Sequence, residues 1–192
     1  MKKRTAIIGA LVSLLPMGQP LVIGTGAAFI SSAVILSAPE KAKAESAVFY
    51  YNRGVDKSNA GDYYGAISDY NKAIEINPRY ADAYYNRGLA KRKSGDNYGA
   101  ISDYSKAIEI TPMNESAYYN RGNVKGRDLK DYYGAISDFS KVIEINPRNA
   151  NAYGNRGLAK KFIGDMEGAC SDWRKSASMG KANAAQWVRN QC

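Results

Sequence analysis

The sequence of 192 residues contains no histidine and only two cysteines, Cys170 and Cys192. Without histidine there is no Ser–His–Asp or Cys–His nucleophile, no histidine general base and no histidine metal ligand. Two cysteines cannot supply the four thiolates of a zinc or iron–sulfur site. The sequence also has no Walker-type glycine loop. We therefore expect neither an enzyme nor a bound metal or cofactor.

The first 44 residues differ in composition from the rest. Met1–Arg4 is basic, residues 5–39 contain no charged residue, and Ala42-Lys43-Ala44 has the small-x-small form of an export-peptidase site. This order predicts a signal peptide over residues 1–44, cleaved after Ala44. The alternative is an uncleaved membrane anchor, since residues 21–38 would span about 27 Å as a helix. Both the cleaved signal peptide and the uncleaved anchor imply export, to a periplasm, a lumen or the outside of the cell.

Part of the positive charge belongs to this leader. The chain has 27 Lys and Arg residues against 18 Asp and Glu residues, a formal charge of +9. The leader holds five of the basic residues and one acidic residue, so the remainder has 22 basic against 17 acidic residues, or +5. A modest positive charge favours acidic or mixed-charge partners.

A repeat of 34 or 35 residues fills the rest of the chain. The tripeptide Asn-Arg-Gly occurs four times, with its glycines at Gly54, Gly88, Gly122 and Gly157. Prolines recur in phase, and one residue is inserted in the third copy, between Gly122 and Ala135. Such a period is typical of repeat architectures in which each unit packs on the next.

Each copy predicts two helices. In the second copy, residues 81–94 are rich in helix formers, Gly95 suits a left-handed helix end and Asp96 suits the N-cap of the next helix. That next helix has apolar residues at three- and four-residue steps and stops before Pro112. The third copy has Lys130 in place of the turn glycine, so we expect a looser turn over residues 125–131.

This pattern resembles the tetratricopeptide repeat. The residues that carry the resemblance are Tyr84, Gly88, Ala100, Tyr104, Ala107 and Pro112, with their equivalents in the other copies. The resemblance implies an all-α solenoid of helical hairpins, with four repeats at about 47–80, 81–114, 115–149 and 150–183 in a domain over residues 45–192. The chain departs from the family pattern where Arg and Lys replace the usual Leu and Tyr of the first helix.

Two further features are expected from the residues themselves. Ala184, Trp187 and Val188 mark one face of a final helix over about 182–191, which would cover the open end of the last repeat. If that helix folds back, Cys170 lies opposite Cys192, and an oxidising compartment favours a disulfide. A redox-active cysteine pair is the alternative.

Arginine and aspartate also recur in register. If the two helices of a repeat are antiparallel, each arginine lies level with an aspartate, which predicts four ion pairs. A structural pairing is one interpretation, and an anion-binding arginine ladder is the other. The residues are Arg53 with Asp69, Arg87 with Asp103, Arg121 with Asp138, and Arg156 with Asp172.

In proteins of the resembled family, the first helices line a concave groove that holds a peptide or a partner helix. Tyrosines would give rigid contact area and asparagines would bond a peptide backbone. We expect Tyr84 in the core and Tyr85 in the groove. The groove candidates are Tyr51, Asn52, Val55, Tyr85, Asn86, Leu89, Arg92, Tyr119, Asn120, Asn123, Asn155, Leu158 and Lys161, with Lys93 beside them.

These features favour a non-catalytic scaffold or assembly adaptor that binds a segment of a partner protein. Nucleic-acid binding by the basic, tyrosine-rich surface is a second hypothesis, although export and the charge of +5 weigh against it. A tether through residues 21–38 would bring the repeats to a membrane and to membrane-protein partners.

Overall fold

The computed structural model of the chain describes residues 38–192, which form nine α-helices and one π-helical turn. The helices of this part are α1 (Ala38–Asn59), α2 (Tyr63–Ile76), α3 (Ala81–Lys93), α4 (Asn97–Ile110), α5 (Glu115–Asn123), η1 (Val124–Asp128), α6 (Tyr132–Ile145), α7 (Ala150–Phe162), α8 (Met166–Ser178) and α9 (Ala182–Gln191). Almost all of the predicted leader and the candidate anchor at residues 21–38 lie outside the described residues.

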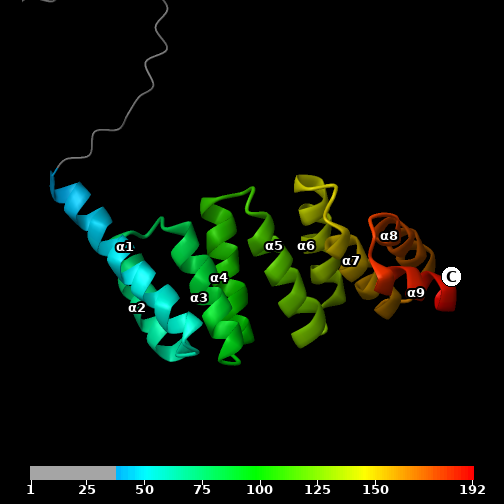
Figure 1. Ribbon diagram of the computed structural model, residues 1–192, viewed down its shortest axis with the longest axis horizontal. Coiled ribbons are helices and arrows are strands. Elements are labelled where there is room, and N and C mark those ends of the chain that lie inside the picture. Colours follow the sequence, from blue (N-terminus) through cyan, green and yellow to red (C-terminus); the bar gives the residue numbers. More distant parts are fainter. Residues whose placement is uncertain (1–37) are drawn as a thin grey trace, which may run out of the picture. The chain divides into compact units, whose positions relative to one another are not determined.

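The helices stack in chain order as a solenoid of four hairpins (Figure 1). Each first helix (α1, α3, α5, α7) packs on the second helix of its own repeat (α2, α4, α6, α8). Helices α3, α5 and α7 also pack on the second helix of the preceding repeat. The predicted all-α fold of tetratricopeptide type, with four repeats and a final helix, is confirmed.

Caps and turns define the helix ends as the sequence predicts. The carboxylate of Asp96 accepts a hydrogen bond from the amide of Gly99, and equivalent aspartates cap α2, α6 and α8. Gly95 has a φ of 91°, a conformation that costs an L-residue about 1–2 kcal/mol. Helix α4 ends at Ile110, with Thr111 as its C-cap immediately before Pro112.

A close helix approach explains the repeated Gly and Ala. A Cβ at Gly88 would lie 2.8 Å from the ring of Tyr104 and 3.3 Å from the backbone oxygen of Ala100. Tyr104 and Ala100 are fully buried beside that crossing. In the core of each hairpin an aromatic ring therefore packs on a glycine. The neighbouring repeat covers the apolar surface that the hairpin leaves exposed.

Helix α9 covers the last repeat. Ala184 is buried, and the rings of Trp187 and Trp173 lie 5.5 Å apart. Trp187 also lies near Gly154, which stands where the first three repeats have Tyr51, Tyr85 and Tyr119. Loss of that tyrosine makes room for the final helix.

Candidate functional site

The arginines and aspartates of the repeat form one cluster per hairpin around a buried aspartate, which we call the clamp. In the second repeat the guanidinium of Arg87 donates to both oxygens of Asp103, at 2.6 and 2.8 Å, and Lys91 lies 2.9 Å from the same carboxylate. Asp103 is only 2% exposed. The other clamps join Arg53, Lys57 and Asp69; Arg121, Lys125 and Asp138; and Arg156, Lys160 and Asp172.

The clamps also connect successive repeats. The remaining amino group of Arg87 donates to the amide oxygen of Asn71 in the repeat before it, and Arg121 and Arg156 reach Ser105 and Ser140 in the same way. Each of these arginines also lies over a tyrosine ring of its own helix. Each of these guanidinium groups therefore donates to three acceptors within the protein, which favours the structural interpretation of the clamps over an anion-binding ladder.

The lowered pKa of Asp69 in the first clamp fits a structural ion pair. The guanidinium of Arg53 holds the pKa of Asp69 at about 2, below its ordinary 3.8, and Lys57 adds to the effect against the opposing influence of burial. The carboxylate is therefore charged at all physiological pH values. The two cations balance a charge that would otherwise be too costly to bury.

Tyrosines and asparagines of the first helices form a second periodic contact. The amide of Asn86 donates to the hydroxyl of Tyr51 at 2.8 Å, and Asn120 donates to Tyr85 at 2.9 Å. Asn155 continues the series with Tyr119, at 3.1 Å. These tyrosines are half-buried, and burial raises the pKa of Tyr85. The side chains that we expected in a groove thus also hold neighbouring repeats together.

Other groove candidates differ from the expectation. Arg92 is paired with Asp128 at 3.0 Å. Asn123 is only 7% exposed, and its amide oxygen accepts a bond from Asn155. Tyr84 is half-buried, as Tyr85 is, so the expected division into a core and a groove tyrosine is wrong. Val55, Leu89 and Leu158 are half-buried against the core, whereas Asn52, Lys93 and Lys161 are exposed.

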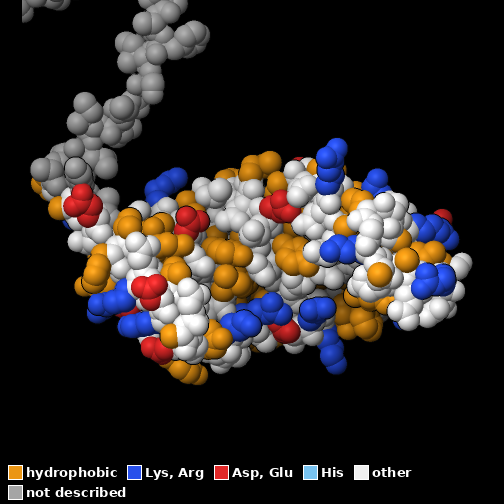
Figure 2. Space-filling model, viewed as in Figure 1, with side chains coloured by type: hydrophobic (Ala, Val, Ile, Leu, Met, Phe, Trp, Pro, Cys, Tyr) orange, Lys and Arg blue, Asp and Glu red, His pale blue; other side chains and the backbone are white. Residues whose placement is uncertain are grey.

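Basic side chains gather at the ends of the first helices. Figure 2 shows Lys and Arg along the lower edge of the visible face, where Figure 1 places the turns between first and second helices. Among the described residues, four cations of this edge have no carboxylate within 4 Å. They are Lys93, Arg127, Lys130 and Lys161.

The third repeat absorbs its inserted residue in a π-helical turn. In η1 the amide of Leu129 bonds the carbonyl of Val124, and the amide of Asp131 bonds the carbonyl of Lys125 at 2.8 Å. The other repeats make the same closing bond with one residue fewer. The segment is therefore a wider but regular turn rather than the looser turn we expected, and it keeps Lys125 in its clamp.

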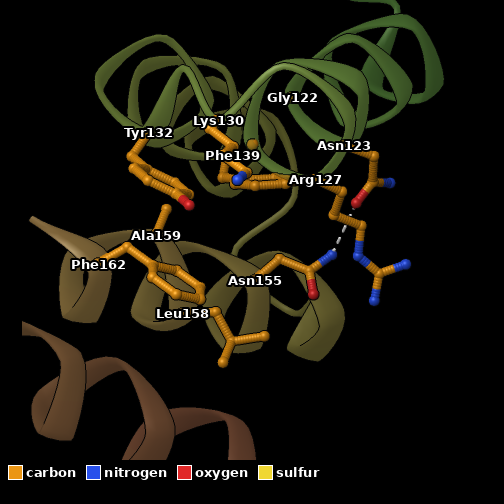
Figure 3. Close-up of a pocket in the computed structure, with 11 residues that line it drawn as sticks. Gly122, Asn123, Arg127, Lys130, Tyr132, Phe139, Asn155, Leu158, Ala159 and Phe162 are labelled. Atoms are coloured by element: carbon orange, nitrogen blue, oxygen red, sulfur yellow. Dashed lines mark hydrogen bonds between the residues drawn. The ribbon is translucent and has the colours of Figure 1, made fainter.

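A pocket of about 520 Å³ opens beside this turn, between α5, η1 and α7, with α6 as its floor. We call it the α5–α7 pocket (Figure 3). Phe139, Ala159 and Leu158 form its apolar lining, and the rings of Tyr132 and Phe162 stack 4.7 Å apart at one side. The lining also includes Gly122, Asn123, Gly126, Arg127, Lys130 and Asn155. The sequence signal that could have located this pocket is the insertion itself.

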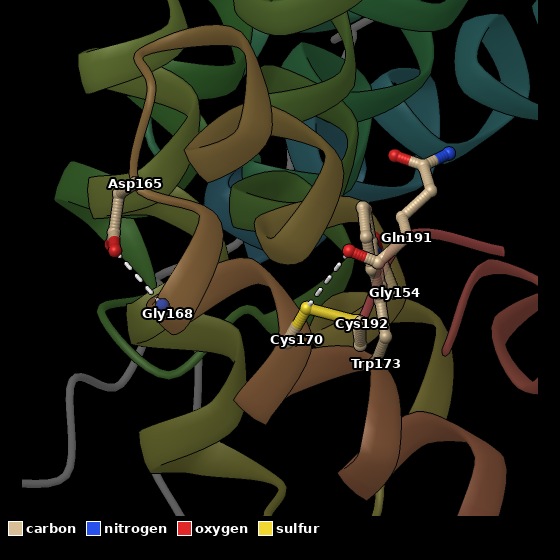
Figure 4. The surroundings of a disulfide bond; sticks show 7 residues. All are labelled: Gly154, Asp165, Gly168, Cys170, Trp173, Gln191 and Cys192. Carbon is tan, nitrogen blue, oxygen red and sulfur yellow. Dashed lines mark hydrogen bonds between the residues drawn. A yellow bond between two sulfur atoms is a disulfide. The ribbon is translucent and has the colours of Figure 1, made fainter. Parts of the chain in front are cut away.

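The two cysteines form a disulfide that fixes the end of the chain (Figure 4). Cys170 lies in α8 and Cys192 directly follows α9, with their Cα atoms 5.7 Å apart. Trp173, one turn along α8, donates to the carbonyl of Gly154 at 3.3 Å. The disulfide therefore holds the capping helix α9 on the last repeat.

Within residues 38–192, no three Cys, Asp or Glu side chains converge as metal ligands would. Over the same part of the chain, no helix combines the length and apolar character needed to span a bilayer.

Comparison with known proteins identifies the repeat. A family model described as TPR repeat matches residues 59–95 and 88–128, and a tetratricopeptide repeat model matches residues 115–149. An uncharacterized protein of Methanocaldococcus jannaschii is 49% identical over 39 residues, which are 20% of this chain and 45% of that protein. The chain thus spans less than half the length of that relative.

Solved structures share the fold. The crystal structure of MamA is 26% identical, with a TM-score of 0.69 over 76% of this chain and 84% of MamA. The TPR domain of Arabidopsis OM64 is also 26% identical, with a TM-score of 0.59 over 62% of this chain and 98% of the domain. The first TPR domain of Spaghetti (RPAP3), bound to an HSP90 peptide, has 23% identity and a TM-score of 0.61 over 63% and 95%.

Proposed function

The chain contains tetratricopeptide repeats, and we propose that it is a non-catalytic scaffold that binds a segment of a partner protein along its first helices. One observation carries the proposal. The first helices and the turns that follow them bring an open, largely apolar pocket together with four unpaired cations on one edge of the described residues. A concave apolar site rimmed by a few polar groups is the usual form of a binding site.

Charge indicates the kind of partner. The unpaired cations at the ends of the first helices would attract an acidic or mixed-charge segment and speed its encounter with the protein. The Spaghetti TPR domain binds its peptide with the same general fold, which supports a peptide or helix as the bound element.

We also propose that the protein acts outside the cytoplasm, released by cleavage near Ala44 or anchored through residues 21–38. The uncharged stretch over residues 5–39 and the Ala-Lys-Ala site support this proposal. Its partners would then be exported or membrane proteins.

Cross-linking capture from the envelope and exported fractions of the native cell tests the interaction. The bait is the wild type beside Lys93→Glu/Lys161→Glu, which reverses two exposed cations of the first helices. The control is Arg79→Glu/Lys175→Glu, which makes the same change in net charge at exposed positions elsewhere. We expect one protein to be captured by the wild type and the control but lost from the first variant. Equal capture by all three would remove the first helices as the binding site, and nuclease-sensitive capture would favour nucleic acid.

A further inference from the structure

We propose that the α5–α7 pocket is the specificity pocket of the scaffold, and that it takes one large apolar or aromatic side chain of a partner segment with carboxylates beside it. The inference rests on the proposed function, because it names the segment that the scaffold would select.

The size and lining of the pocket indicate a large apolar side chain. The volume of about 520 Å³ lies within the range of about 300–1,000 Å³ for ligand sites. Phe139 is buried at its floor, and Phe162 is 62% exposed at its mouth although its ring stacks on Tyr132. An incoming aromatic ring could therefore pack against rings that are already in place, at low entropy cost.

The charges around the pocket indicate a carboxylate. Arg127 and Lys130 both line it, neither has a carboxylate within 4 Å among the described residues, and no lining residue is acidic. Asp128, between them in sequence, is held by Arg92. An acidic group next to the inserted side chain could pair with Arg127 or Lys130 without displacing an existing ion pair.

Amide groups near the wall remain available. Asn155 donates to both Tyr119 and Asn123, which leaves its own oxygen and the amino group of Asn123 without a partner among the described residues. In Figure 3 these two amides lie side by side at one end of the pocket. One free acceptor and one free donor match the two hydrogen-bonding groups of a peptide unit.

The pocket belongs to one place in the solenoid. Asn123 stands where the other repeats have Val55, Leu89 and Leu158, and Gly126 within η1 has no side chain to fill the space. A Cβ at Gly126 would lie 3.0 Å from that of Ala135. The insertion and these substitutions together open the third repeat toward α7, so a partner can be recognised in one register along the repeats.

Selection from a random peptide library displayed on phage, with the full chain as target, tests the inference. We expect the enriched peptides to carry an aromatic or large apolar residue next to Asp or Glu. Synthetic peptides of the enriched sequences are then titrated by fluorescence anisotropy. The variant Arg127→Ala/Lys130→Gly should weaken binding about tenfold, and Phe162→Ala should do so through lost ring contact.

The control variant is Arg174→Ala/Lys175→Ala, which removes two exposed charges from α8 and should leave binding unchanged. Circular dichroism checks that all variants fold. If Phe162→Ala does not fold, Arg127→Ala/Lys130→Gly alone provides the test. Enriched peptides that bind the pocket variants as tightly as the wild type would overturn the inference and leave the scaffold function standing. If no peptide is enriched and capture by Lys93→Glu/Lys161→Glu is unchanged, both the pocket inference and the proposed scaffold function are overturned.

Discussion

Asp103→Ala should strongly destabilise the solenoid, because Asp103 is the centre of an interior clamp. The carboxylate is 2% exposed, accepts bonds of 2.6 and 2.8 Å from Arg87, and lies 2.9 Å from Lys91. Its removal leaves two cations facing one another with 16% and 20% of their side chains exposed. Breaking a buried pair in this way costs roughly 3–5 kcal/mol. For a domain of this size the melting temperature should fall by about 10 °C.

The expected loss of stability depends on where the clamp lies in the solenoid. Arg53, at the first clamp, has 41% of its side chain exposed and, among residues 38–192, donates hydrogen bonds only to Asp69, so Asp69→Ala should cost less, about 2 kcal/mol. Glu75 is exposed on α2, and Glu75→Ala should change stability by no more than about 0.5 kcal/mol.

Urea denaturation followed by circular dichroism measures all three variants. Arg87→Ala and the double variant with Asp103→Ala complete a cycle that isolates the pair. A loss below about 1 kcal/mol for Asp103→Ala, comparable to that of Glu75→Ala, would refute the structural role of the clamps and return the arginines to a binding role.

Because the pKa of Asp69 is lowered to about 2 in the folded protein, its contribution is full above about pH 4 and lost as the pH falls toward 2; Asp69→Asn should flatten this part of an acid-unfolding profile. Lys130 has a φ of 58° where the other repeats have glycine, so Lys130→Gly should raise stability by about 1 kcal/mol in urea. The hydroxyl of Tyr104 is buried without a hydrogen-bond partner, so Tyr104→Phe should be neutral or stabilising by thermal melting. Reduction of the Cys170–Cys192 bond should cost on the order of 3 kcal/mol, with increased hydrogen exchange concentrated in α9. A loss of stability with Lys130→Gly or Tyr104→Phe, a steep acid profile for Asp69→Asn, or unchanged exchange in α9 would each contradict its own prediction.

Much of the fold follows from the sequence because it depends on local, periodic signals. Glycine and aspartate between the helices specify the turns, and Gly88 opposite Tyr104 specifies the close crossing. The height of each arginine relative to its aspartate follows from the antiparallel hairpin. These features recur, so one copy supports the interpretation of the next.

The site is less predictable because it depends on which polar groups remain unused. The sequence cannot reveal that Asn86 is committed to Tyr51, or that Arg92 is paired with Asp128 across a repeat boundary. The lysines of the clamps were also missed, since they stand at a position that the family fills with tyrosine. The inserted residue predicted a difference in the third turn, but it did not indicate that the turn would be π-helical and would leave Lys125 in its clamp.

Site-specific photo-cross-linking in the native cell tests the central claim most directly. A photoreactive amino acid replaces Phe162, at the mouth of the α5–α7 pocket, or Tyr98, which is 77% exposed on the second helix α4. The scaffold account predicts a cross-link from position 162 to one segment of a partner protein, identified by mass spectrometry, and none to that segment from position 98. Cross-links from position 98 alone, or from position 162 to nucleic acid alone, would contradict it.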